Sequence, residues 1–264
     1  MGALHVGHLS LVELARKRAD LVWVSIFVNP TQFNDNSDFE GYPRDLEADL
    51  EICRNRGVDL VYAPEVEDLY PVGDQTRVGV GDLAEPLCGA SRPGHFEGVA
   101  TVVARLLLAA KPHVAIFGEK DFQQLAVIRR MASDLGIDVE ILGGAIVREP
   151  DGLALSSRNA RLGPIARKQA VALVDALDAA ERAVANGERA RDALLAEVRR
   201  HLETATQATL DYAELRDPDT LEPVPPALDG PALLALAVEF EPDPDGAGKP
   251  VRLIDNRVLL PAQP

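Results

Sequence analysis

The feature that most constrains the fold is a nearly continuous apolar run, Leu21 to Val28, that stops at Asn29-Pro30. A run without polar alternation is typical of a strand buried on both faces of a parallel sheet. Around it, helical patterns cover roughly 9–18, 43–56, 97–110 and 120–135, and strand patterns cover 59–63, 113–117 and 138–148. Strands that alternate with helices predict βαβ units and one open parallel sheet covered on both faces.

The residue pattern changes after about residue 150. Helical spacing of Ala, Arg, Glu and Leu over 164–206, interrupted near Asn186-Gly187, predicts two helices. Strand patterns follow at 209–215, 232–240 and 251–260, the last two joined by a stretch rich in Pro, Asp and Gly. The predicted fold class is therefore α/β, with a parallel-sheet domain over 1–150 and a smaller α+β domain over 151–264.

Charge and composition exclude several classes of protein. The 264 residues carry 27 Lys and Arg against 42 Asp and Glu, a net charge of −15, which argues against a broad surface for nucleic acid or anionic lipid. Two cysteines cannot make a disulfide framework, and no apolar run reaches the roughly 18–20 residues that span a bilayer. The first residues lack the features of a secretory signal. We expect a cytoplasmic protein without nucleic-acid or membrane partners.

Ligands of open α/β sheets bind beyond the carboxyl ends of the strands, and the first polar cluster of interest is His5-Val6-Gly7-His8. The i, i+3 spacing puts both imidazoles on one side of a first helical turn. That turn has unpaired N–H groups and a positive dipole end, which favour a phosphate. The competing interpretation is a pair of surface histidines at a helix start.

Two further clusters follow predicted strands. Gly118-Glu119-Lys120-Asp121, with Gln124 one turn later, combines a phosphate partner with a carboxylate able to bind a ribose hydroxyl or a metal. Its acidic residues also suit ordinary helix capping. Leu155-Ser156-Ser157-Arg158-Asn159, after Val147, can clamp a polyphosphate or can be an interdomain linker with a helix cap.

Two loops support this interpretation, although each is more often a plain connection. Asn29-Pro30-Thr31-Gln32-Phe33 follows the most hydrophobic strand, where a rigid turn aims Gln32 at the strand ends. The stretch 91–99 combines Gly, Pro, Arg and His before a helix, as an active-site loop does.

Taken together and in this order, these clusters and loops resemble the pantothenate synthetase family. Its members are ATP-dependent pantoate–β-alanine ligases with an H-x-G-H signature. The matching pieces span nearly the whole chain: residues 1–8, Asn29 to Phe33, Tyr42-Pro43-Arg44-Asp45, Arg92 to Phe96, 118–121 with Gln124, and 156–159. The resemblance implies a Rossmann-like first domain, a second domain that closes over the site as a lid, and a homodimer. It implies that pantoate is adenylated by Mg²⁺-ATP and that β-alanine then displaces AMP.

The resemblance also implies residue roles. His8, His5 and Lys120 would be catalytic, with His8 the acid or the stabiliser of phosphate charge. Gln32 and Gln124 would hold pantoate, whereas the metal ligands are unknown. The residues implied to bind ATP are Met1, Gly2, Ala3, Leu4, His5, Val6, Gly7, His8, Gly118, Glu119, Lys120, Asp121, Val147, Leu155, Ser156, Ser157 and Arg158.

Two departures from the family pattern stand out. Val6 occupies a position where the family usually has Glu, and the family begins with a strand ahead of the segment that is Met1 here. That missing first strand would be central to the sheet, so we expect this form to be less stable and less active than an N-terminally extended one. The alternatives are another small-molecule nucleotidyltransferase, or a nucleotide-binding module impaired by the missing strand. The short length and acidic charge disfavour a tRNA synthetase.

Overall fold

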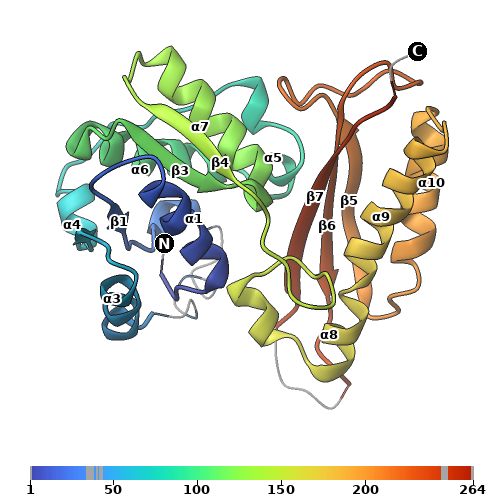
Figure 1. Ribbon diagram of the computed structural model, residues 1–264, viewed down its shortest axis with the longest axis horizontal. Coiled ribbons are helices and arrows are strands. Elements are labelled where there is room, and N and C mark those ends of the chain that lie inside the picture. Colours follow the sequence, from blue (N-terminus) through green and yellow to red (C-terminus); the bar gives the residue numbers. More distant parts are fainter. Residues whose placement is uncertain (1, 34–38, 40, 42–43, 245–248, 263–264) are drawn as a thin grey trace. The chain divides into compact units, whose positions relative to one another are not determined.

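The computed structural model describes residues 2–33, 39, 41, 44–244 and 249–262. The chain divides into two compact units, Met1–Val147 and Arg148–Pro264 (Figure 1). Each unit has its own cluster of buried apolar side chains. Within the described residues, no helix is long and apolar enough to cross a membrane.

The first unit contains parallel strands, as the sequence predicts, but in two separate pairs. Strand β1 (Trp23–Ser25) pairs with β2 (Leu60–Tyr62), and β3 (Val114–Gly118) pairs with β4 (Glu140–Gly144). No strand of the described residues joins the two pairs. The predicted parallel strands of an α/β fold are confirmed, but the described strands form two pairs and not one continuous sheet, because an apolar pattern identifies a strand without identifying its neighbours.

Strand β1 also differs from its prediction. Only three residues of the apolar run pair with β2, and the side chains alternate: Val22 and Val24 are buried, whereas Trp23 is 53% exposed. The buried side joins Val12, Ile26 and Cys53 in the core of this unit. The run is therefore buried on one face and not on both, although its composition alone does not distinguish the two cases.

Helices surround these strands. The longer ones are α1 (Val6–Arg16), α3 (Leu46–Asn55), α6 (His95–Ala110) and α7 (Phe122–Asp134), and the short α4 (Val66–Leu69) and α5 (Cys88–Ser91) were not predicted. Helix α1 packs against β3 and β4, and α6 packs against α7. A side chain at Gly144 on β4 would overlap Leu11 of α1, so this glycine permits the close packing of helix on strand.

The second unit is an antiparallel sheet covered by helices, which confirms the predicted α/β class with a smaller α+β part. Its strands run in the order β5 (Ala208–Arg216), β6 (Ala232–Phe240) and β7 (Val251–Leu259). Its helices are α8 (Pro164–Gln169), α9 (Ala172–Ala185) and α10 (Arg191–Leu202). Three helices replace the two that were predicted, because the break at Ala170-Val171 carries neither Gly nor Pro to mark it.

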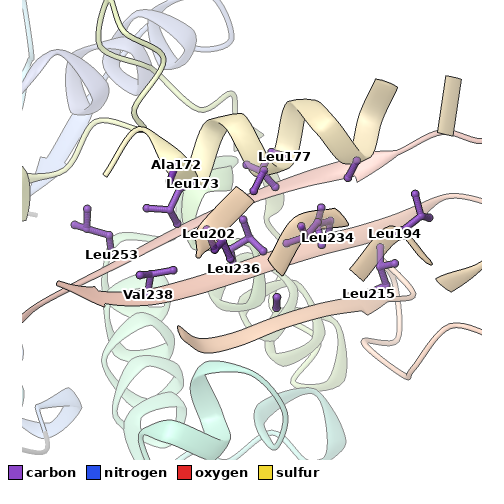
Figure 2. Packing of buried hydrophobic residues seen from close by; sticks show 14 of the residues in the cluster. Ala172, Leu173, Leu177, Leu194, Leu202, Leu215, Leu234, Leu236, Val238 and Leu253 are labelled. Carbon is purple, nitrogen blue, oxygen red and sulfur yellow. The ribbon is translucent and has the colours of Figure 1, made fainter. Parts of the chain in front are cut away.

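The core of this unit lies between the sheet and its two long helices. Leu173 and Leu177 of α9 face Leu234 and Leu236 of the central strand β6 (Figure 2), and all four side chains are almost completely buried. Full burial of one such side chain contributes about 2 kcal/mol. The loop that carries Ser156, Ser157 and Arg158 belongs to this unit and contacts β7.

Candidate active site

Helix α1 begins with two imidazoles that cap it. His5 is the N-cap residue, and its Nδ1 accepts a hydrogen bond from the Gly7 N–H at 3.2 Å. The His8 Nδ1 in turn accepts from the His5 N–H, also at 3.2 Å. Two histidines thus form the reciprocal capping arrangement that Ser and Glu usually make. A Cβ at Gly7 would lie 3.0 Å from the His5 ring, so glycine leaves room for the ring in this position.

These hydrogen bonds determine the tautomer of both rings. A backbone N–H only donates, so each Nδ1 that receives one carries no proton, and each neutral ring bears its proton on Nε2. The ring centroids lie 4.0 Å apart. Both imidazoles therefore offer an Nε2–H donor from the same helical turn.

Both imidazoles are held neutral. Burial, with smaller contributions from His5 and Lys120, lowers the pKa of His8 to about 3, although Asp121 acts in the opposite direction. Burial and then Lys120 lower the pKa of His5 as well. At neutral pH the pair consists of hydrogen-bond donors without net charge.

The segment before α1 is tied to helix α3. Asp49 accepts hydrogen bonds from the backbone N–H groups of Ala3 and Leu4. Ala3 adopts a left-handed backbone conformation, with φ of 48°, which is uncommon for a residue other than glycine. Gly2 is buried near Val28, and Met1 lies outside the described residues.

The second cluster follows β3. A 3₁₀ turn, Glu119–Asp121, separates Gly118 at the end of β3 from α7, which begins at Phe122 and not at Lys120 as predicted. The chain makes this tight turn before the α-helix starts, a boundary that the apolar pattern does not resolve. Asp121 occupies the N-cap position without a side-chain capping bond, so the capping interpretation does not hold for it.

The first unit brings three of the predicted site segments together. Lys120 and Asp121 lie near enough to affect the pKa of His8, and Lys120 affects that of His5. Val147 lies beside Gly7, because a methyl group in place of a Gly7 hydrogen would be 3.9 Å from the Val147 Cβ. The start of α1, the turn after β3 and the chain after β4 therefore converge.

Gln32 lies in the 3₁₀ helix η1 (Pro30–Gln32), and its side-chain oxygen accepts from the Asn29 amide at 3.2 Å. Asn29 is only 3% exposed and also donates to the Gly98 carbonyl. Gln32 lines a pocket of about 210 Å³ together with His95. The side chain predicted to hold pantoate is thus anchored by a buried asparagine.

On α7, Gln124 is half-buried, whereas its neighbour Gln123 is buried and its side chain has a structural role. The Gln123 side chain accepts from the Cys88 N–H and donates to the carbonyls of Leu83 and Pro86. Sequence reasoning missed this role, and it also missed Asn29 and Asp49. Only Asn29 carries a signal, as an N-cap residue before Pro30.

The third cluster belongs to the second unit. Ser156 caps the 3₁₀ helix η4 (Ser157–Arg161), its hydroxyl accepting from the Arg158 N–H at 3.2 Å, so the helix-cap interpretation holds for Ser156. Leu155, Ser157 and Arg158 are partly exposed beside it. The buried Asn159 donates to the Glu149 carboxylate at 2.7 Å and to the Ala154 carbonyl at 3.1 Å. These bonds fasten the loop to its own unit.

No group of three or more His, Cys, Asp or Glu in the described part of the chain is placed to hold a metal ion. A Mg²⁺ that arrives on a triphosphate needs only one or two protein carboxylates, because phosphates and water fill its other positions. Asp121, exposed beside the imidazole pair, fits that requirement.

Fold and site together define an α/β nucleotide-binding enzyme with an H-x-G-H helix start. A sequence model of the pantoate–β-alanine ligase family matches residues 1–258. This chain belongs to that family, whose members are ligases, so the predicted resemblance and enzyme class are confirmed.

Individual relatives agree with this assignment. The pantothenate synthetase of Geobacter sulfurreducens is 54% identical over 259 residues, 98% of this chain and 88% of that protein. The crystal structure of pantothenate synthetase from Thermus thermophilus matches with a TM-score of 0.92 and 46% identity, over 99% of this chain and 91% of that one. The pantoate–β-alanine ligase of Francisella tularensis, complexed with βγ-ATP and β-alanine, matches with a TM-score of 0.77 and 36% identity, over 98% and 87% of the two chains.

Proposed function

We propose that this chain joins pantoate to β-alanine at the expense of ATP, in two steps. A carboxylate oxygen of pantoate bonds to the α-phosphorus of ATP, and pyrophosphate leaves. The amine of β-alanine then attacks the acyl carbon of the adenylate, loses a proton, and AMP leaves as the amide forms. Membership of the ligase family supports this reaction, and it does not favour a nucleotidyltransferase that stops at the first step or an inactive nucleotide-binding module.

The observation that carries the proposal is the pair of neutral imidazoles at the start of α1, beside Lys120. The first nucleophile is a carboxylate, which is ionised at neutral pH and needs no general base. Catalysis then depends on orientation and on stabilising charge at the α-phosphate. In the protein without ligand, where its pKa is about 3, His8 is a neutral Nε2–H donor.

The other roles that we propose come from the family resemblance. In the first unit, the residues proposed to bind ATP are 2–8, Gly118 to Asp121 and Val147. In the second unit, they are Leu155, Ser156, Ser157 and Arg158. Gln32 and Gln124 bind the hydroxyls and carboxylate of pantoate without a full counter-charge. ATP enters as its Mg²⁺ complex, with Asp121 as the carboxylate available to the metal.

We further propose that the protein is a cytoplasmic homodimer. The two cysteines, Cys53 and Cys88, are buried and form no disulfide bond, as suits a reducing compartment. The net charge of −15 argues against nucleic acid and anionic membranes as partners.

The test is an assay of the two half-reactions with one substrate omitted at a time. Exchange of labelled pyrophosphate into ATP should require pantoate but not β-alanine, whereas steady release of AMP should require both. Release of AMP at the same rate with and without β-alanine would indicate a different transferase. Tight ATP binding without any exchange would indicate an inactive module.

A further inference from the structure

Asp49 is a buried residue whose carboxylate accepts hydrogen bonds from two backbone N–H groups. Its Oδ2 accepts from Ala3 at 2.9 Å and its Oδ1 from Leu4 at 2.7 Å, across more than forty residues of sequence. The side chain is 2% exposed, whereas Glu47 and Glu51 on the same helix are exposed. An ionised carboxylate has two acceptors and no donor, so it suits two converging N–H groups.

The backbone held by Asp49 leads directly into the imidazole pair. The peptide after Leu4 supplies the His5 N–H, which donates to Nδ1 of His8. The Leu4 side chain packs against the apolar core of the first unit, so polar and apolar contacts fix this residue together. The direction in which the His8 ring points therefore depends on a segment that Asp49 fastens.

We propose that Asp49 is a positioning residue for adenylation, which acts by fixing the peptide that orients His8. This inference rests on the proposed function and adds to it a residue that lies outside the H-x-G-H signature. Replacing Asp49 by Asn turns one acceptor into a donor that faces an N–H group. The loop would then shift, and both Nε2–H donors would leave their positions.

Asp59 provides a matched control in the same unit. Its carboxylate accepts from the Val22 N–H at 2.7 Å and pairs at 2.9 Å with Arg16, which lies at the opposite end of α1 from the residues that Asp49 binds. We expect Asp49→Asn to lower the rate of pantoate-dependent pyrophosphate exchange at least tenfold, with little change in the KM for pantoate. Asp59→Asn should stay within about twofold of the wild type.

A double-mutant cycle separates positioning from general stability. If Asp49 acts through His8, Asp49→Asn should cost little further exchange activity in the His8→Ala background. An equal loss in both backgrounds would overturn the proposal, as would an Asp49→Asn rate equal to that of Asp59→Asn. Absence of exchange in the wild type would instead refute the proposed function.

If Asp49→Asn fails to fold, Asp49→Glu decides the question, because it keeps both acceptors but displaces them by one methylene. A melting temperature near that of the wild type with exchange lowered at least fivefold supports positioning. Exchange at the wild-type rate with a displaced carboxylate overturns it.

Discussion

The Nδ1 atom of His8 accepts the backbone N–H of His5, and the two rings lie 4.0 Å apart with an interplanar angle of 35°. The helix start therefore fixes which nitrogen of each ring carries the proton. It also places the two rings where protonation of one disfavours protonation of the other. The helix start that we propose as the phosphate site thus carries two neutral imidazole donors.

The first prediction concerns the pH response of His8. Its folded-state pKa of about 3 lies below the ordinary 6.5, so between these values the unfolded chain binds more protons. The free energy of unfolding should therefore fall as the pH drops from about 6.5 toward 3, by an amount on the order of a few kcal/mol. In ¹⁵N NMR, the His8 ring should remain the neutral Nε2–H tautomer at pH 5.

His8→Asn identifies the His8 signal and serves as the control. Its amide oxygen can replace Nδ1 as acceptor, but it lacks the Nε2–H donor, so pantoate-dependent exchange should fall about 10²- to 10³-fold. The pH slope of stability should become shallower in this variant. A His8 ring that titrates near pH 6.5 in the folded protein would contradict the prediction.

The second prediction separates two adjacent glutamines. Gln123→Ala removes three hydrogen bonds to the 83–88 segment, one of them the buried bond from the Cys88 N–H, so we expect a loss of about 2–3 kcal/mol of stability. Gln124→Ala should leave the melting temperature within about 1 °C and raise the KM for pantoate at least tenfold. Thermal unfolding and initial rates at varied pantoate check both variants. If Gln123→Ala raised the KM for pantoate and Gln124→Ala lowered the melting temperature, the proposed role of Gln124 would be wrong.

Much of the fold was predictable from local patterns. The strand at 113–117 and the three strands of the second unit appear within a residue or two of their predicted places, because apolar runs or apolar alternation mark them and turn residues flank them. The pairing of β1 with β2 and of β3 with β4 was not predictable in this way. Pairing is a long-range property, and strands of similar composition fit several neighbours.

The site residues also divide into those that local patterns predict and those that depend on long-range contacts. The histidines and Lys120 stand out because their side chains are unusual at strand and helix ends, and the structure brings them together. Asp49 and Gln123 do not stand out, since each is one of several similar residues on its helix and only tertiary packing buries it. Sequence reasoning finds groups of distinctive chemistry more readily than the ordinary residues that support them.

The third prediction concerns a buried ion pair in the second unit. Arg148 donates to both oxygens of Asp255, at 2.6 and 3.0 Å, and the Asp255 side chain is 1% exposed. Asp255→Ala would leave the guanidinium without its partner, so we expect a loss of about 3 kcal/mol in urea unfolding. The exposed pair Arg130–Asp134 is the control, and Asp134→Ala should cost at most about 0.5 kcal/mol. Equal losses of stability in the two variants would show that burial does not increase the contribution of the Arg148–Asp255 pair.

The fourth prediction concerns the loop that carries Ser156 to Arg158. Asn159 donates to one oxygen of Glu149, and Arg167 binds the other oxygen at 2.6 Å. Asn159→Asp would set two carboxylates against each other, so the loop should detach and the KM for ATP should rise about tenfold or more, with the KM for pantoate nearly unchanged. Adding Glu149→Gln restores a donor opposite the new carboxylate and should recover part of the ATP affinity. Loss of pantoate affinity instead, or no recovery in the double variant, would show that this contact does not hold the loop for ATP.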